Sequence, residues 1–435
     1  MYAPIRLRAR VATFRVFAVS LVVPLLGACG EPSRGGEGRE EAFQTSDSGA
    51  SDAGDGAAIV QVSAGSNHTC ARRASGAVSC WGWNVAGQLG DGGTSDRHEP
   101  APVVGLDDAV EVSAGGFHTC ARRASGAVAC WGDNSYGQLG DGSTTAQLAP
   151  TPVVGLTDAV EIDASSSQTC ARRASGGVVC WGKNSAGLGD GTSVQSSTPV
   201  AVAGITDAVE VTVSFNHACA RRASGGVVCW GSNSSGQLGD GSTITEGGLE
   251  GGGGGSSSEG QGCDGSATGR RTPCPVVDLD DAVELVAGGF HPCARRASGS
   301  AVCWGGNGSG ELGDGSTIDR STPAAVAGLT DAVQLAASSR HTCALRASGA
   351  VACWGAGAFG QLGDGSTTSR PTPGPVVDLD DAVEIAGGLT IQVGDHTCAR
   401  RASGGVVCWG RNAFGELGDG STSDRTAPTP VVALP

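Results

Sequence analysis

The stretch GSNHTCARRASGAVSCWG at residues 65–82 decides the fold, because it recurs seven times along the chain with few changes. The second copy, GGFHTCARRASGAVACWG, begins at Gly115, and the seventh contains HTCARRASGGVVCWG from His396. Every copy holds a cysteine, nine intervening residues, a second cysteine and then Trp-Gly. Successive Trp-Gly pairs are 50, 50, 49, 74, 50 and 55 residues apart. A period near 50 predicts an array of stacked units rather than separate domains.

Each repeat is predicted to form four short strands. In the second repeat these are Ala109–Ala114, which alternates apolar and polar residues, then His118–Arg122, Ala127–Trp131 and Pro152–Gly155. Prolines favour the last of these as an outer edge strand. No segment of the repeats shows sustained helical periodicity over three turns. The predicted fold class is therefore all-β, a seven-bladed β-propeller with four antiparallel strands per blade.

The paired cysteines are predicted to form disulfides inside each hairpin. If Gly126 takes the positive-φ position of a three-residue turn, Cys120 faces Cys130. Opposed residues of this kind lie about 4.5 Å apart at Cα, a separation that a disulfide can span. The expected pairs are Cys70–Cys80, Cys120–Cys130, Cys170–Cys180, Cys219–Cys229, Cys293–Cys303, Cys343–Cys353 and Cys398–Cys408, with Cys263–Cys274 in an insertion. Such pairing indicates an oxidising compartment.

Residues 1–28 have the pattern of a lipoprotein signal peptide. A basic start precedes an apolar run, about Val16–Leu26, that is short for a membrane span. The run ends in Leu-Gly-Ala-Cys29, which resembles the lipobox of bacterial lipoproteins, and the resemblance implies a lipid anchor on Cys29. The alternative is an ordinary signal peptide followed by an incidental cysteine. Gly30, in place of an aspartate that retains lipoproteins at the inner membrane, favours the outer membrane or cell surface.

The rest of the chain divides into a tether and the propeller. Residues 29–57 are acidic and rich in Gly and Ser, and we expect them to be disordered. The propeller spans 58–435, with a low-complexity insertion at 244–274. Its units are approximately 58–107, 108–157, 158–206, 207–280, 281–330, 331–380 and 381–435.

The charge of the chain limits its partners. The formal net charge is −15, whereas nucleic-acid binding needs a basic footprint. We therefore expect no nucleic-acid partner, and we expect a monomer.

The motifs H-T-x-A, S-G-x-V-x-x-W-G, N-x-x-G-Q-L-G-D-G and T-P-x-x-V together resemble the repeat of the regulator of chromosome condensation family, over residues 59–435. The resemblance implies a seven-bladed propeller and protein–protein contact through the loops of one face. It also offers an alternative function, guanine-nucleotide exchange or other GTPase regulation. An exported protein is not expected to encounter either the GTPase or GTP. A glycan-acting propeller enzyme is a second alternative. The Asp box of sialidase-like propellers is absent from the sequence, and no carboxylate pair stands out.

The repeated polar residues are predicted to be structural. Six histidines precede a cysteine by two positions, but the third copy has Gln168 there, and the cysteine spacing suits a hairpin rather than a zinc knuckle. The aspartates of L-G-D-G lack a calcium-ligand ladder and are expected to form turns. The paired arginines at the hairpin tips are expected to form surface ion pairs with acids such as Asp107-Asp108. No metal, cofactor or catalytic residue is expected.

A partner is predicted to bind the face that carries the first-to-second strand loop and the long loop after Trp-Gly. The repeats differ from one another most in these loops, where aromatic and basic residues stand out. Such side chains are typical anchors of protein interfaces. The candidate residues are Trp83, Phe117, Tyr136, Lys183, Phe290, Arg340, Phe359, Arg411 and Phe414. The alternatives are ordinary loop variation or aromatic rings placed between blades.

Overall fold

The structure is a computed structural model that describes residues 56–184, 187–242, 269–388, 395–432 and 434. The described residues belong to one compact unit, Ser51–Pro435. The predicted signal peptide, Cys29, nearly all of the tether and Cys263 lie outside the described residues. Among the described residues there is no helix of the length and apolarity needed to span a membrane.

The described residues form 28 strands. The innermost strand of each blade is β1 (Ile59–Ala64), β5 (Ala109–Ala114), β9 (Ala159–Ala164), β13 (Ala208–Val213), β17 (Ala282–Ala287), β21 (Ala332–Ala337) or β25 (Ala382–Gly387). The second strands are β2 (His68–Arg73), β6 (His118–Arg123), β10 (Gln168–Arg173), β14 (His217–Arg222), β18 (Pro292–Arg296), β22 (His341–Arg346) and β26 (His396–Arg401). The third strands are β3 (Val78–Gly82), β7 (Val128–Gly132), β11 (Val178–Gly182), β15 (Val227–Ser232), β19 (Ala301–Gly305), β23 (Val351–Gly355) and β27 (Val406–Gly410). The outermost strands are β4 (Arg97–Pro102), β8 (Gln147–Pro152), β12 (Ser196–Ala201), β16 (Gly269–Pro275), β20 (Arg320–Ala325), β24 (Arg370–Pro375) and β28 (Arg425–Pro430).

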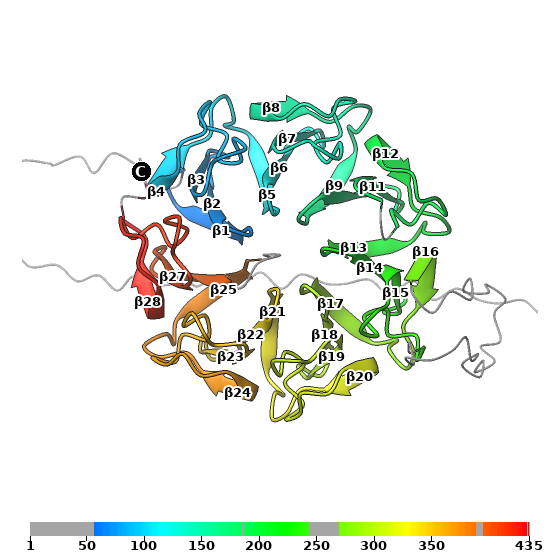
Figure 1. The fold of residues 1–435 in the computed structure, drawn as a ribbon, viewed down its shortest axis with the longest axis vertical. Coiled ribbons are helices and arrows are strands. Elements are labelled where there is room, and N and C mark those ends of the chain that lie inside the picture. Colours follow the sequence, from blue (N-terminus) through cyan, green and yellow to red (C-terminus); the bar gives the residue numbers. More distant parts are fainter. Residues whose placement is uncertain (1–55, 185–186, 243–268, 389–394, 433, 435) are drawn as a thin grey trace, which may run out of the picture. The chain divides into compact units, whose positions relative to one another are not determined.

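These strands make seven antiparallel four-stranded sheets, each built from four strands that are consecutive in sequence. Figure 1 shows the sheets arranged as blades around a central axis, with β1, β5, β9, β13, β17, β21 and β25 nearest to it. The predicted seven-bladed, four-stranded propeller is confirmed. Within the described part of the chain, no strand is exchanged between the first and last blades.

The outermost strand was predicted wrongly. The expected strand Pro152–Gly155 is instead β8, Gln147–Pro152, which pairs with β7 through Ala129 and Cys130. Val153 still donates its amide to Val128 O of β7 at 2.9 Å, and its side chain is buried in the core between blades. The next amide, of Val154, donates to Gly140 O instead, and Gly155 turns with a φ of 70°. The strand therefore ends as the chain turns into the seam between blades, where Val153 gains apolar burial.

The hairpin register agrees with the prediction in every blade. Cys120 pairs directly with Cys130, Gly126 has a φ of 83°, and the two Cα atoms are 4.1 Å apart. All seven predicted hairpin disulfides are present. Cys274 is disulfide-bonded as well, whereas its predicted partner Cys263 lies outside the described residues.

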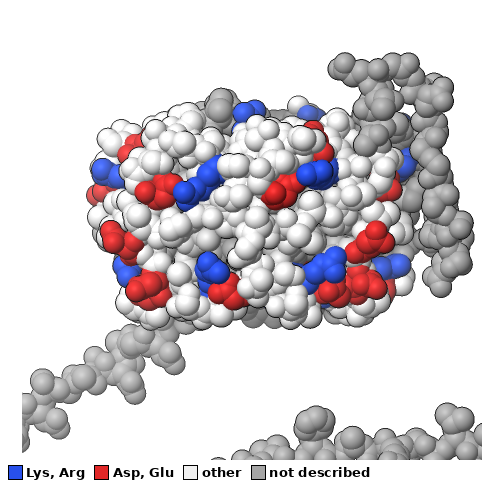
Figure 2. All heavy atoms as spheres, turned by 90° about the horizontal axis from the view of Figure 1, so that it is seen from below, with Lys and Arg blue, Asp and Glu red and all other residues white. Residues whose placement is uncertain are grey.

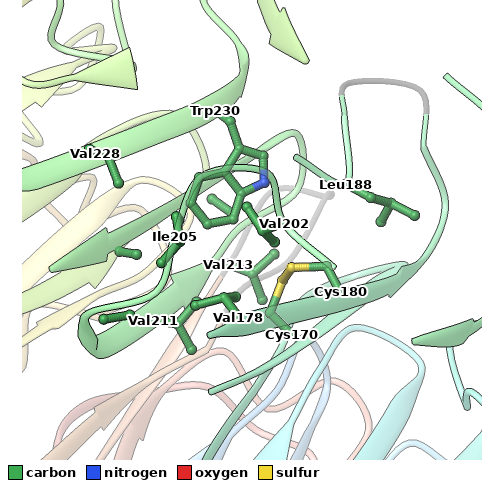
Figure 3. Close-up of a cluster of buried hydrophobic side chains, with 13 residues drawn as sticks. Cys170, Val178, Cys180, Leu188, Val202, Ile205, Val211, Val213, Val228 and Trp230 are labelled. Carbon is green, nitrogen blue, oxygen red and sulfur yellow. A yellow bond between two sulfur atoms is a disulfide. The ribbon is translucent and has the colours of Figure 1, made fainter. Parts of the chain in front are cut away.

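The hydrophobic core is divided among the seams between blades. Figure 3 shows the seam between the third and fourth blades, where Trp230 shares one cluster with the Cys170–Cys180 disulfide, Leu188 and Val211. The other seams repeat this combination of a disulfide from one blade and a tryptophan from the next. All seven repeat tryptophans are fully buried. Each disulfide thus supplies core surface as well as a cross-link.

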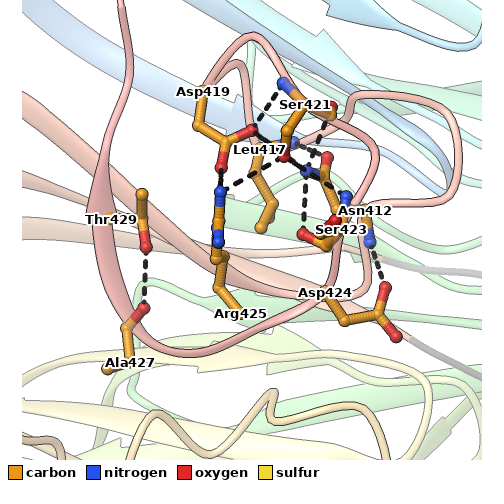
Figure 4. A network of polar contacts seen from close by, with 9 residues as sticks. All are labelled: Asn412, Leu417, Asp419, Ser421, Ser423, Asp424, Arg425, Ala427 and Thr429. Atoms are coloured by element: carbon orange, nitrogen blue, oxygen red, sulfur yellow. Dashed lines mark hydrogen bonds and ion pairs between the residues drawn. The ribbon is translucent and has the colours of Figure 1, made fainter.

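The L-G-D-G loop is held by hydrogen bonds centred on an asparagine. In the seventh blade, Asn412 Nδ2 donates to Asp419 Oδ1 and to the carbonyl oxygens of Ser421 and Ser423 (Figure 4). Asp419 also accepts from the Ser421 amide and pairs with Arg425 at 2.6 Å. The predicted turn-forming role of these aspartates is confirmed.

A candidate interaction face around the channel mouth

The two faces of the propeller carry different loops. The hairpin tips and the blade-to-blade connections share one face, since the Ala124 amide donates to Asp108 O and the Ala109 amide to Gly76 O. The first-to-second strand loops and the start of the loops after Trp-Gly share the other, where the Asp133 amide donates to Phe117 O. This second face, here called the loop face, is the one predicted to bind a partner.

Aromatic side chains of the loop face lie in contact across blade boundaries. Trp83 of the first blade stacks on Phe414 of the seventh, with ring centroids 5.2 Å apart, and meets Phe117 of the second edge-on at 5.2 Å. Arg411 lies 5.9 Å from the Phe414 centroid and 5.8 Å from that of Phe359. Five predicted residues therefore form one continuous arc from the sixth blade to the second.

The other four predicted residues surround a cavity of about 430 Å³ at the same face. Tyr136, Lys183, Phe290 and Arg340 line it, and Phe117 joins it to the aromatic arc. The cavity spans loops of five blades, from the second to the sixth. Tyr136 and Phe290 are 37% and 40% exposed, whereas the other aromatic residues that the structure describes are buried or partly buried. The structure therefore brings all nine predicted residues to one face.

Sequence reasoning missed Phe215, which also lines the cavity. Its ring centroid lies 6.4 Å from that of Phe290 on the next blade. Phe215 occupies a position at which other repeats have Gly or Ser, such as Gly116 and Ser166. An aromatic residue at a small-residue position is the signal that would have identified it.

The opposite face carries the predicted ion pairs. Arg123 Nε lies 2.7 Å from Asp108 Oδ1, and Arg296 and Arg401 pair with Asp281 and Asp381 in the same way. These partners are roughly one-third to two-fifths exposed, so each pair contributes well under about 1 kcal/mol. Figure 2, an edge-on view, shows acidic and basic side chains side by side around the wall.

A second set of ion pairs lies at the channel rim of that face. Arg122 pairs with Glu111 at 2.7 Å, and Glu111 Oε1 accepts from the Ile162 amide of the next blade. In the first blade Gln61 replaces the glutamate and bonds both the amide and the carbonyl of Val112. Burial raises the pKa of Glu161, the third-blade equivalent, to about 7. These side chains join neighbouring blades and are structural.

The repeated histidines form hydrogen bonds between blades. His118 Nε2 lies 2.8 Å from Thr169 Oγ1, which itself donates to Gln138 O at 2.9 Å. The same carbonyl accepts from Trp181 Nε1 at 2.9 Å. Burial lowers the pKa of His118 to about 4, so this histidine is neutral. The geometry supports the predicted structural role, and among the described residues no three His, Cys, Asp or Glu side chains are grouped to hold a metal ion.

Two seams depart from this pattern. Between the third and fourth blades Gln168 replaces the histidine, Ala218 replaces the threonine, and Trp230 Nε1 has no hydrogen-bond partner among the described residues. Between the fourth and fifth blades Pro292 replaces the threonine, and neither ring nitrogen of His217 has such a partner. Both seams adjoin the cavity of the loop face.

Two family models match the chain, and both are described as the regulator of chromosome condensation (RCC1) repeat. One matches residues 59–88, 109–138, 208–237, 332–361 and 393–416, and the other matches 75–122, 125–172, 298–345 and 348–399. Together these matches span more than half of the 435 residues. No curated protein sequence matches.

Solved structures share the fold. Yeast RCC1 (Prp20), solved bound to Kap60, has a TM-score of 0.68 and 18% sequence identity, over 86% of this chain and 85% of that chain. Human WBSCR16 has a TM-score of 0.64 and 21% identity, over 78% of this chain and 85% of that chain. Similarity at this level of identity establishes a common architecture.

Proposed function

Since the chain belongs to the regulator of chromosome condensation repeat family, we propose that it is a non-enzymatic protein–protein interaction module that binds its partner through the loop face. Propellers of this kind are protein-interaction or GTPase-regulator modules. The seven disulfides indicate an oxidising environment, where a nucleotide-dependent GTPase partner is not expected. Interaction therefore takes precedence over nucleotide exchange.

The observation that carries the proposal is the arc of Phe359, Arg411, Phe414, Trp83 and Phe117. Partly exposed aromatic rings with an arginine, rimmed by polar loops, have the composition of an interface core. The repeat tryptophans that stabilise the fold are buried elsewhere. The arc is therefore free to serve a partner without loss of the core.

The test is partner capture from a cell-envelope extract with chemical crosslinking. The triple variant Trp83→Ala, Phe117→Ala, Phe414→Ala should lose the captured partner and keep the unfolding midpoint of the parent protein within a few degrees. A control triple variant, Val60→Ala, Val110→Ala, Val383→Ala, should keep the partner. Each of these valines is the partly buried or exposed second residue of an innermost strand, which begins beside the hairpin tips of the opposite face. Capture that survives the first triple variant would refute the assignment of the face.

We also propose that the protein is displayed on the bacterial envelope by a lipid on Cys29, at the outer membrane or cell surface. The lipobox-like sequence before Cys29 and the oxidising environment support this localisation. Cells fed labelled palmitate should incorporate the label into the parent protein and not into Cys29→Ala. Equal labelling of both proteins would exclude this anchor.

A further inference from the structure

The cavity of the loop face combines aromatic walls with positive charge. Phe117, Phe215 and Phe290 contribute rings from three blades. Lys183 Nζ lies 5.0 Å from the ring centroid of Tyr136, which holds the ammonium group at the cavity edge. The cavity volume of about 430 Å³ is enough for a few amino-acid side chains.

The two basic side chains of the cavity, Lys183 and Arg340, form no ion pair with any residue that the structure describes. Most other described arginines pair with a carboxylate, as Arg346 does with Asp331, and Arg72, Arg73 and Arg271 are further exceptions. Lys183 and Arg340 come from the third and sixth blades, so they reach the cavity from different sides.

Asp133 is the one carboxylate among the residues that line the cavity. Its Oδ2 accepts from Gln138 Nε2 at 2.8 Å, and its Oδ1 accepts from the Ser135 amide at 3.1 Å. These hydrogen bonds direct the carboxylate into its own loop but leave its negative charge in place. The carboxylate of Asp395 lies beside Arg340 and accepts from the Arg340 amide at 3.2 Å. Among the residues that line the cavity, the two cations outnumber the one carboxylate of Asp133, so the lining is positive although the chain has a net charge of −15.

We propose that this cavity binds an acidic peptide segment of the protein partner, with a carboxylate between Lys183 and Arg340 and an apolar or aromatic side chain among the phenylalanine rings. The inference rests on the proposed function and adds the chemistry of the recognised segment. One carboxylate of a peptide can lie between two cations that come from different blades. A polyanion such as a lipid surface would instead be repelled by the net negative charge of the protein.

The experiment measures binding of a fluorescent peptide in which two glutamates flank a phenylalanine. The probe should bind the mature protein, and binding should weaken with rising salt. Lys183→Glu and Arg340→Glu should each weaken it by about fivefold to tenfold, since each change replaces an attraction with a repulsion. Arg271→Glu supplies the control, because Arg271 is exposed on β16, outside the cavity, and its reversal changes the net charge equally.

Several outcomes would overturn the inference. One is equal loss in the Arg271→Glu control, and another is equal binding of a peptide with lysines in place of the glutamates. Preferential binding to anionic lipid vesicles would assign the cavity to a membrane. Tightest binding to a peptide copied from residues 37–43 of the chain would assign it to the protein's own amino-terminal segment. A partner that is captured normally by both charge-reversal variants would refute this inference and leave the proposed function intact.

Discussion

His118 Nε2 lies 2.8 Å from Thr169 Oγ1 across the seam between the second and third blades. The same bond joins His68 to Thr119, His291 to Thr342, His341 to Thr397, and, between the last and first blades, His396 to Thr69. One repeated side chain thus stabilises five of the seven seams. The titration of the histidine, and the absence of this hydrogen bond from the other two seams, have measurable consequences.

The protein should lose stability steeply in acid. Burial lowers the pKa of His68, His217, His291 and His396 to about 3 and that of His118 to about 4. A histidine whose folded-state pKa is depressed costs stability as pH falls from its unfolded value near 6.5 towards the folded value. In that window each such histidine lowers the free energy of unfolding by about 1.4 kcal/mol for every pH unit of acidification.

Buried acids oppose this loss above about pH 4.5. Burial raises the pKa of Glu161 and Glu416 to about 7 and that of Asp163 to about 6, so their protonation favours the folded state as pH falls from 7. The free energy of unfolding should therefore decline most steeply between about pH 4.5 and 3.

Urea unfolding across a pH series measures this decline in stability. His118→Gln, which copies Gln168, should reduce the slope, and Thr169→Val should lower stability at every pH without reducing it.

The unsatisfied seam between the fourth and fifth blades should be repairable. Pro292→Thr places a hydroxyl where other seams have one, between His217 and the Gln237 carbonyl that already accepts from Trp304 Nε1 at 3.1 Å. Satisfying a buried imidazole should add about 1–2 kcal/mol to the free energy of unfolding. Pro292→Val has a similar shape and no hydroxyl, so an equal gain in that variant would mean that relief from proline, and not the hydrogen bond, is responsible.

Close approach of the L-G-D-G loop to the neighbouring tryptophan should forbid a side chain at Gly90. A Cβ there would lie 2.6 Å from Trp131 Nε1, and the φ of Gly90 is 68°. Gly105 has nearly the same φ, 66°, with nothing within 4 Å of a Cβ. Gly105→Ala should cost about 1 kcal/mol for the left-handed conformation alone, and Gly90→Ala should cost about 1–3 kcal/mol more. Calorimetric unfolding compares the stabilities of the two variants. Equal losses of stability would mean that Trp131 moves aside at no energetic cost.

Removal of one hairpin disulfide should destabilise the ring without unfolding it. Cys120→Ala with Cys130→Ala opens a loop of separation 10 and should cost about 2–4 kcal/mol, because the unfolded chain gains freedom and a buried core contact is lost. Mass mapping of the parent protein should find all seven hairpin pairs. Free thiols or links between blades at these positions would contradict the register.

The blades could be predicted well from the sequence because the seven copies of the repeat can be compared with one another position by position. The hairpin of Cys120 and Cys130 follows from alternation and turn length, both local properties. The position of β8 was missed because Val153 is held by a seam between blades, which no local pattern reveals. The nine face residues were found as positions that vary among repeats, but the pairing of Phe215 with Phe290 depends on how loops of adjacent blades converge.

The contacts that close the ring are the same as those between internal blades, which bears on whether the chain can be opened at a different blade boundary. Ile59 and Trp81 of the first blade share one cluster with Leu417 of the last, and Val431 packs against it. Trp81 Nε1 donates to Glu416 O, as the equivalent tryptophans donate to the matching carbonyl at five other seams. The junction of the ends is chemically the same as an internal junction, so the fold is cyclic in all but its covalent connectivity. Circular permutants opened at another blade boundary, with the present ends linked, should assemble the same body.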